Sequence, residues 1–540
     1  MVSVQMSKEW LLRESGASES ELLEALPQIK AGVESNGELL SLEVTGDRPD
    51  LLGRWGVLRA LKGRLGTEAG LAKLKLTKSK TRLTVEESVK KIRPYALAAF
   101  ARGAKFDAES IAELMQLQEK LVLTHGRRRR KVAVGIHDAS TVEGDLVYKA
   151  VDAKQTFQPL GWREEASISR IMKEHDKGRE YAYCLDGKHY PLFCDAKGVL
   201  SLPPIINSQR TAVTLWTTDL LFDVTGTDWE ACNTALNILC HEFQDAGCKI
   251  EAVECDGRLA PEVKPHEMLL SLDDANRALG VKLEASDATA LLAKQRLEAT
   301  HKAGVLRCFI PRYRADFLHP VDLVEELALG YGYNEFTPKP PKAFTRGGLA
   351  AETLQDNAAR DALAAAGFVE ASTGVLCSAE TAAKAFSEKE IVRIRNPMSS
   401  EYGCVRSSLL PSLLGLLSEN THRAYPQRVF EVGETVERGG REGTLTRRHA
   451  CAASCHANAD LAEATATLAH LARALGVQTV FKPSTEKKFM KGRQAEVIMK
   501  GKRVGFVGEV HPQVLENFGL AAPCVAFEID LDSIGECKRG

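Results

Sequence analysis

Apolar and polar positions alternate along the chain with two periods, which predict short strands and amphipathic helices. In residues 18–34 the apolar side chains recur at helical spacing, and residues 38–53 indicate a strand, a turn and the start of a helix. Within that turn, GDRPD, Pro49 suits a first helical turn and Asp50 favours a helix N-terminus. Because the arginine of this motif can pair with its neighbouring carboxylates, we favour a fold-defining turn over a catalytic role.

The same periods continue through the middle of the chain. Residues 93–106 indicate a strand, residues 109–126 a helix, and residues 131–140 a buried strand that ends in a polar turn. Residues 220–247 predict a strand followed by a helix, which either Thr227 or Asp228 can cap. Strands and helices are therefore mixed throughout this region.

The last half of the chain predicts a small unit and then a larger one. Residues 266–336 contain two helices joined by a strand, and the proline-rich residues 337–344 are the clearest linker. A larger α/β module follows from about residue 350 onward, in which Arg406 opens an apolar helix and residues 428–433 form a core strand.

A chain of 540 residues has room for three to five domains at ~100–200 residues each. We predict a multidomain α/β and α+β protein with four parts. These are an N-terminal α+β domain (residues 1–80), a mixed α/β domain (90–258), a small winged-helix-like domain (262–337) and a C-terminal module built on an antiparallel sheet (345–540).

Charge is balanced, with 71 Lys and Arg against 72 Asp and Glu, so any nucleic-acid contact must come from a local patch. One such patch is the run Arg127, Arg128, Arg129, Arg130 and Lys131, for which we expect an exposed loop. Two interpretations stay open for it: a merely solvated charge run, or contact with the phosphates of an RNA backbone.

The beginning of the sequence has no apolar signal-peptide core, and no stretch approaches the ~18 apolar residues of a membrane span, so we expect a cytoplasmic protein without membrane contact. The thirteen scattered cysteines favour reduced, mostly buried thiols. Cys451, Cys455 and His456 have no second ligand pair at zinc-like spacing, which favours a structural role for them.

The sharpest group of acidic residues is Asp316, Asp322, Glu325 and Glu326. The last three lie on neighbouring faces of one predicted helical turn, and the first precedes that turn across a loop. A cluster of oxygen ligands alone suits magnesium. The alternative is an ion-pair network, in which Arg312 and Arg314 neutralise these acids.

A second group lies on the polar rim of the middle domain, where Ser201 and Asn207 flank a pair of prolines and Asp223 and Thr225 close a strand. A serine or threonine nucleophile needs an activating base, and no GxSxG elbow accompanies these residues. A pocket that binds a polar group and positions water is therefore favoured over covalent catalysis. The chain also has neither a GxxxxGKS loop nor a GxGxxG fingerprint, so nothing requires ATP binding.

Eight segments in sequence order carry a family resemblance: TGDRPDLL, GIHD, LSLPPIINS, FDVTGTD, YRADFLHPVDLVEELALGYGYN, NPMSSEYGCVRSSLLPSLL, RVFEVGE and VGEVHPQVLENFGL. With them the chain resembles the β subunit of phenylalanyl-tRNA synthetases of the short archaeal and eukaryotic type, across nearly its whole length. The family implies a heterotetramer of two α and two β subunits, which binds tRNA(Phe) and attaches phenylalanine to it.

In this family the α subunit holds the phenylalanine and ATP sites. The C-terminal module of the β subunit resembles a class II synthetase catalytic domain that does not activate the amino acid, and a structural role is favoured for Arg406. The resemblance also assigns Asp316, Asp322, Glu325 and Glu326 as magnesium ligands, in a structural rather than a catalytic site.

The middle domain resembles the family's editing domain, which hydrolyses tyrosine wrongly attached to tRNA(Phe). A pocket shaped for phenylalanine discriminates only about 10²-fold against an analogue that merely adds a hydroxyl, so a second pocket completes the selection. The resemblance implies that Leu192 and Ser201 line this pocket and that Asp223 and Thr225 contact the amino acid, with Asn207 as a further candidate. Two rivals are a free-standing aminoacyl-tRNA hydrolase and a non-enzymatic RNA- or protein-binding scaffold.

Overall fold

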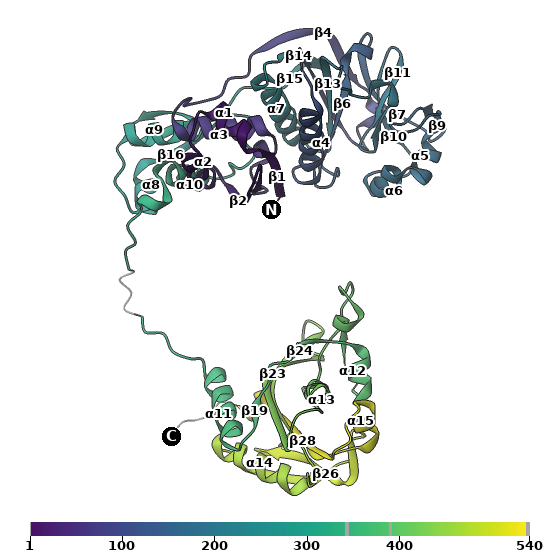
Figure 1. The fold of residues 1–540 in the computed structure, drawn as a ribbon, viewed down its shortest axis with the longest axis vertical. Helices are drawn as coiled ribbons and strands as arrows, with labels where there is room; N and C mark the ends of the chain where they lie inside the picture. The colour runs from purple at the N-terminus through teal and green to yellow at the C-terminus, as the bar shows by residue number, and fades with distance from the viewer. Residues whose placement is uncertain (1, 341–344, 388–390, 536–540) are drawn as a thin grey trace. The chain divides into compact units, whose positions relative to one another are not determined.

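The computed structural model describes residues 2–340, 345–387 and 391–535, and the chain divides into two units, Met1–Pro340 and Pro341–Gly540 (Figure 1). Among the described residues, the first unit builds four sheets and the second builds two. None of the helices in these segments combines the length and the apolar character that a membrane crossing requires. The predicted multidomain mixture of helices and sheets is confirmed.

The N-terminal sheet is antiparallel, in the order β1-β3-β2. Three helices share an apolar cluster with it. The GDRPD motif forms a short turn at Pro49–Leu51, where Arg48 donates to both carboxylate oxygens of Asp50 at 2.9 and 2.8 Å. The arginine therefore pairs within its own motif, as predicted. The elements are β1 (Val2–Ser7), α1 (Lys8–Ser15), α2 (Glu19–Ala25), β2 (Ala31–Asn36), β3 (Leu39–Val44) and α3 (Arg54–Leu65).

The largest sheet has ten strands, in the order β12-β11-β10-β7-β4-β14-β5-β13-β6, with β15 beside β14. Strand β4 runs parallel to both β14 and β7, and the other neighbours are antiparallel, so the sheet is mixed. Its strands are β4 (Leu76–Val85), β5 (Tyr95–Arg102), β6 (Val132–Asp138), β7 (Leu146–Val151), β10 (Tyr190–Asp195), β11 (Gly198–Leu202), β12 (Ile206–Asn207), β13 (Asp219–Gly226), β14 (Lys249–Cys255) and β15 (Arg258–Ala260).

Helices α4 (Ala108–Leu123) and α7 (Trp229–Asp245) pack against this sheet. Helices α5 (Ile168–Glu174) and α6 (Asp176–Tyr181) follow a short hairpin of β8 (Thr156–Phe157) and β9 (Ala166–Ser167). The predicted strands and helices of this region are confirmed within a few residues. Asp228 caps α7 by accepting from the Ala231 amide at 2.8 Å, which decides between the two predicted capping residues.

The two-residue alternation of β13 decides which side chains become available for chemistry. Phe222 packs against α7, where its ring centroid lies 5.2 Å from that of Phe243, and Leu220 and Val224 share its face of the strand. Asp223 and Thr225 consequently point to the opposite face of the sheet, because successive side chains of a strand alternate. Both are almost fully buried there, at 2% and 0% exposure, and so require polar partners.

Residues 266–336 build a third sheet, in the order β16-β18-β17, with three helices around its apolar cluster. The predicted strand between the first two helices is wrong. Those helices are joined by a loop whose Leu283 exchanges two backbone hydrogen bonds with the side chain of Asn276 on α8, so the apolar Leu283 is buried without pairing to a strand. The elements are β16 (His266–Ser271), α8 (Leu272–Leu279), α9 (Ala285–Lys294), β17 (Glu298–Lys302), β18 (Val305–Ile310) and α10 (Pro320–Tyr331).

The second unit is built on a seven-stranded sheet, in the order β19-β23-β24-β28-β27-β26-β25, antiparallel except for the β19-β23 pair. Both faces are covered, because alternate residues of β24 belong to two separate apolar clusters. The strands are β19 (Val369–Glu370), β23 (Gln427–Arg438), β24 (Thr444–Cys455), β25 (Thr479–Pro483), β26 (Phe489–Met499), β27 (Lys502–Val510) and β28 (Cys524–Asp530).

One face of that sheet packs against α11 (Ala351–Ala365) and α14 (Leu461–Ala474), and the other packs against α13 (Leu410–Glu419) and α15 (Pro512–Asn517). The described residues also form α12 (Ala379–Lys384) and a small sheet, in the order β20-β22-β21. The small strands are β20 (Leu376–Cys377), β21 (Val392–Arg393) and β22 (Cys404–Val405).

Helix α13 begins at Leu410, so the prediction that Arg406 opens it is wrong. The N-terminus of α13 has no cap from its own segment. Instead, Glu528 on β28 accepts hydrogen bonds from the amides of Leu409 and Leu410 at 3.0 and 3.2 Å and from the Ser408 hydroxyl at 2.6 Å. A distant carboxylate therefore fixes the start of this helix, which no local pattern reveals.

Replacing Glu528 by Ala should release the first turn of α13. Leaving buried donors unsatisfied costs about 1–3 kcal/mol, which corresponds to a rise in local amide exchange of roughly 10- to 100-fold. Hydrogen exchange measured by mass spectrometry over residues 408–414 tests this, with Glu496→Ala on β26 as the control, because Glu496 pairs with the half-exposed Arg503. Unchanged exchange in the Glu528 variant would contradict the capping role.

Candidate functional site

A cleft of about 520 Å³ opens in the first unit where the two edges of the ten-stranded sheet, β11-β12 and β13-β6, approach each other. Its walls come from α4, from strands β6, β11, β12 and β13, and from the loop that carries the cis Pro203-Pro204 bond. Three of the five predicted pocket residues line it: Ser201, Asn207 and Asp223. The structure thus brings together segments that lie far apart in the sequence.

Asp223 is the centre of a buried polar network in this wall. Its Oδ2 accepts from the Ser201 hydroxyl at 2.6 Å and lies 2.9 Å from His137 Nε2, and its Oδ1 accepts from the Gly135 amide at 3.0 Å. The other imidazole nitrogen, Nδ1, lies 2.8 Å from the Thr211 hydroxyl. Nε2 is therefore the imidazole nitrogen that is placed to donate to the carboxylate, and the Thr211 hydroxyl beside Nδ1 donates to the carbonyl of Ser208 at 3.4 Å.

The order of these groups is not that of a nucleophilic triad. In a triad the imidazole contacts the serine and the carboxylate contacts the imidazole. Here Asp223 lies between Ser201 and His137, so the imidazole is not placed to take a proton from the serine hydroxyl. This order disfavours covalent catalysis by Ser201, and the pocket that binds a polar group and positions water stays a prediction.

The other predicted pocket residues have different surroundings. Asn207 lines the cleft and donates to the carbonyl of Ile136 at 3.1 Å. Leu192, on β10, is 1% exposed within an apolar cluster and does not line the cleft. Thr225 accepts from Arg93 Nε at 3.0 Å and also lies outside the lining. The roles that the resemblance gives to these residues stay predictions.

His137, Thr211 and Gly135 are functional candidates that the predicted residue set lacks. The signal for two of them was present, because GIHD is one of the resemblance segments. Strand alternation places Gly135 and His137 on one face of β6, and Gly135 pairs directly with Asp223 across the sheet. Only the three-dimensional register shows that this face meets the Asp223 carboxylate.

Gly135 is required by close approach. A Cβ atom at this position would lie 2.5 Å from Asp223 Oδ2, so Gly135→Ala should displace the carboxylate and destabilise the first unit by about 1–3 kcal/mol. Hydrogen exchange over β6 and β13, together with the melting temperature, measures this. Gly46→Ala is the control, because a Cβ there meets no atom within 4 Å. Equal protection in both variants would contradict the close-packing argument.

The basic run forms the turn between α4 and β6, at the rim of this cleft. Arg127, Arg128 and Arg129 all have positive φ, at 49°, 52° and 65°, which is an unusual backbone for such side chains. Arg129 lines the cleft, donates to the carbonyls of Pro204 and Ile205 at 3.0 and 2.8 Å, and stacks over Tyr181. The turn is therefore held in one conformation.

The remaining arginines of the turn face solvent, and the predicted exposed loop is confirmed. Arg127, Arg128 and Arg130 are exposed, and Arg130 stacks over Tyr183. Of the five cations, only Lys131 lies within 4 Å of a carboxylate of the described residues, at 3.5 Å from Asp228. Guanidinium groups that are held in place and have no acidic partner are well suited to bind an external anion.

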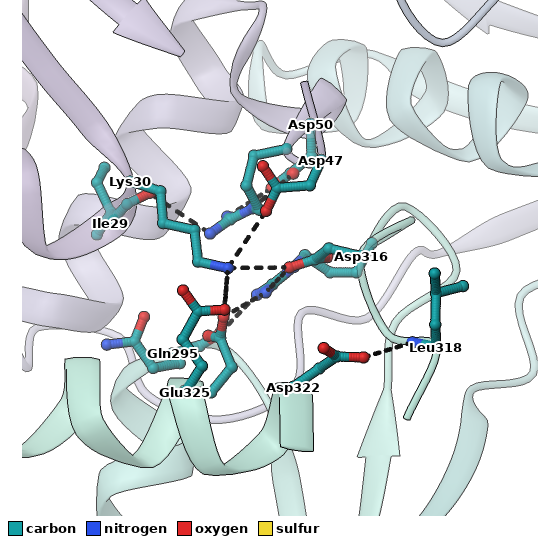
Figure 2. A network of polar contacts seen from close by, with 12 residues as sticks. Ile29, Lys30, Asp47, Asp50, Gln295, Asp316, Leu318, Asp322 and Glu325 are labelled. Carbon is teal, nitrogen blue, oxygen red and sulfur yellow. Dashed lines mark hydrogen bonds and ion pairs between the residues drawn. The ribbon is translucent and has the colours of Figure 1, made fainter. Parts of the chain in front are cut away.

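The predicted magnesium ligands lie where α10 meets the N-terminal domain (Figure 2). Asp316 accepts two hydrogen bonds from Arg314, at 2.8 and 2.6 Å, and Glu326 accepts one from the same guanidinium at 2.8 Å. Burial acts to raise the pKa of Asp316, but the charge and hydrogen bonds of Arg314 outweigh it and lower that pKa below its usual range. Arg312 pairs instead with Glu230 and Glu262.

Asp322 does not join this cluster. Its Oδ2 accepts from the amides of Leu318 and His319, both at 2.7 Å, which caps α10, and Figure 2 shows it directed away from the other acids. Lys30 reaches Asp316, Glu325 and Glu326 from the N-terminal domain instead. In the described parts of the chain, no three His, Cys, Asp or Glu residues are arranged to hold a metal ion. The four predicted ligands therefore do not fit a magnesium ion as they are placed.

Comparison with known proteins gives three family matches that follow one another along the chain. The B3/4 domain matches residues 80–238, the tRNA synthetase B5 domain matches residues 268–333, and the phenylalanyl tRNA synthetase beta chain CLM domain matches residues 337–531. The first of these contains the cleft, and the second contains α10 and the acidic cluster. These matches define the chain as a component of an aminoacyl-tRNA synthetase.

Relatives identify the family. The phenylalanine–tRNA ligase beta subunit of Archaeoglobus fulgidus is 38% identical to this chain over 530 residues, which cover 96% of each chain. The phenylalanine–tRNA ligase beta subunit of Pyrococcus horikoshii is 37% identical over 497 residues, which cover 90% of this chain and 89% of the relative. The crystal structure of an N-terminal fragment of the Pyrococcus horikoshii phenylalanyl-tRNA synthetase beta subunit matches with a TM-score of 0.59 and 35% identity, covering 62% of this chain and 100% of the fragment. The chain belongs to the family of phenylalanine–tRNA ligase β subunits.

Proposed function

We propose that this chain works in the cytoplasm with a phenylalanine-activating α subunit, in a tetramer of two α and two β chains that attaches phenylalanine to tRNA(Phe) with ATP. Its family membership supports this role. The second unit is proposed as a class II-like module that does not activate the amino acid. Arg406 supports that view, because it is 4% exposed and bound to Glu431 at 2.8 Å and to the Glu434 carbonyl at 2.9 Å, and so is occupied in internal contacts.

We propose further that the cleft hydrolyses Tyr-tRNA(Phe). In this reaction water adds to the carbonyl carbon of tyrosine, and the ester bond to the ribose oxygen breaks. The observation that carries the proposal is the Asp223 network, which sets a buried carboxylate and a serine hydroxyl into the wall of an otherwise mostly apolar cleft. Such a wall suits an aromatic amino acid with a polar group that a phenylalanine pocket rejects only weakly.

Asp223→Ala should reduce hydrolysis of Tyr-tRNA(Phe) by the complete αβ enzyme on the order of 10²-fold, because the carboxylate would no longer orient its partners. Formation of Phe-tRNA(Phe) should persist. The measurement is deacylation of preformed Tyr-tRNA(Phe), with Asp219→Ala as the matched control, since Asp219 lies on the same strand but pairs at the surface with Arg102. Equal deacylation by the parent and the Asp223 variant would refute the assignment.

The basic turn is proposed to hold the phosphates of the tRNA beside this cleft. Arg127, Arg128 and Arg130 support this because they are exposed, fixed by the turn, and without a carboxylate within 4 Å among the described residues. Arginine binds phosphate strongly through its planar array of donors. We therefore favour contact with the phosphates of RNA over a merely solvated charge run for these arginines.

The double variant Arg127→Ala with Arg128→Ala should weaken tRNA binding by the complex and make it less sensitive to salt. The slope of the logarithm of affinity against the logarithm of salt concentration should fall in size by about 0.7–0.9 for each phosphate that the turn no longer binds. Filter binding at several salt concentrations measures it, with Arg277→Ala and Arg307→Ala as the control pair, because those exposed arginines pair with Asp274 and Glu267. An unchanged slope would favour a solvated charge run.

A further inference from the structure

The ammonium group of Lys30 lies among four carboxylates (Figure 2). Its Nζ is 2.9 Å from Glu325 Oε2, 3.3 Å from Asp47 Oδ2, 3.6 Å from Glu326 Oε1 and 3.7 Å from Asp316 Oδ2. Two of these acids come from α10, one from the loop before it, and Asp47 from the GDRPD turn of the N-terminal domain. One cation therefore contacts acids from two domains at the position where the predicted magnesium would belong.

The backbone of Lys30 is also unusual. The residue ends the short turn Pro27–Ile29 with φ 65° and ψ 32°, a left-handed conformation that glycine adopts far more easily. Its side chain is only 11% exposed, so the charge is held inside the junction rather than in solvent. A long cationic side chain at a position that favours glycine indicates that the ammonium itself stabilises this site.

Buried charges balance within the cluster. Asp316 and Glu326 are 4% and 1% exposed, and the cations beside them, Arg314 and Lys30, are 2% and 11% exposed. Asp47 and Glu325, at 43% and 46%, remain partly in water. Two buried negative charges thus meet two buried positive charges, which is the condition for burying them at all.

Few oxygens remain for a divalent ion. Both oxygens of Asp316 accept from Arg314, and Asp322 caps α10. Glu326 Oε2 is buried and accepts no hydrogen bond from the described residues. Glu325 and Asp47 each place one oxygen on the Lys30 ammonium. The buried Glu326 oxygen and the outer oxygens of these two partly exposed carboxylates are not arranged as the octahedral oxygen shell that Mg²⁺ demands.

We infer that Lys30 is the resident cation of this acidic junction, and that its ammonium takes the place of a divalent metal ion in this chain. The N-terminal domain and residues 266–336 are then joined by an internal ion-pair network that needs no magnesium. This inference does not depend on the proposed hydrolytic or tRNA-binding functions.

The test removes the ammonium from the full chain in two ways. Lys30→Met keeps the length of the side chain without its charge, and Lys30→Gly also relieves the left-handed backbone, so that a folding defect of one variant does not decide the result. Lys62→Met is the control, because Lys62 pairs with Glu68 away from this cluster. Mn²⁺ binding is measured by electron paramagnetic resonance, and the melting temperature is recorded in chelator and in millimolar Mg²⁺.

The parent chain and Lys62→Met should bind no stoichiometric Mn²⁺ and should melt at the same temperature in chelator and in Mg²⁺. Both Lys30 variants should bind Mn²⁺, melt about 2–4 °C lower in chelator, and recover in Mg²⁺. Stoichiometric Mn²⁺ binding by the parent chain would overturn the inference. So would Lys30 variants that lose stability without gaining Mn²⁺, because the ammonium would then not occupy a cation site.

Discussion

A buried carboxylate must be satisfied by hydrogen bonds or by a cation, and this constraint fixes the main features of the chain. Asp223 organises the wall of the cleft, Glu528 starts α13, and Asp316 and Glu326 join α10 to the N-terminal domain through Lys30. Each carboxylate ties together segments that are distant in sequence. Removing any one partner would leave a charge in a low-dielectric environment, so these networks tolerate little rearrangement.

Two buried carboxylates cap helices from a distance, and their different partners give them opposite pKa shifts. Glu242 on α7 accepts from the amides of Trp55 and Gly56 at the start of α3, at 3.0 and 2.9 Å, yet burial raises its pKa to about 7. Burial also acts to raise the pKa of Glu528, but the hydrogen bond and charge of His449, 2.6 Å away, help to lower it to about 2. For Glu242, the two amides and the charge of Arg59 together do not offset the desolvation, whereas for Glu528 a charged partner in direct hydrogen-bond contact, His449, does.

Patterns within short sequence segments predicted the features that depend on neighbouring residues alone. The strands and helices of the middle domain, the Asp228 cap and the Arg48 pairing within GDRPD follow from periodicity, capping and charge within a few residues. Features set by distant partners were missed or misplaced. Helix α13 starts late because Glu528 supplies its cap, and Asp322 turns to its own helix end although its spacing resembles that of a metal ligand. The sequence pattern predicted Ser201 and Asp223 as pocket residues. Only the register of the strands shows that His137 lies between Asp223 and Thr211.

Arg93 joins the two halves of the proposed tRNA site into one rigid piece. Its guanidinium donates to the hydroxyl and carbonyl of Thr225 at 3.0 and 2.7 Å, and to the carbonyls of Arg129 and Arg130 at 3.1 and 3.3 Å. Burial lowers its pKa, and its hydrogen bonds go to carbonyls and a hydroxyl rather than to a carboxylate. The strand that carries Asp223 and the turn that presents the exposed arginines therefore cannot move independently. In the proposed function, phosphates bound by that turn would set the position of the ester relative to Asp223, and this fixed separation is what a hydrolytic site gains from a rigid sheet.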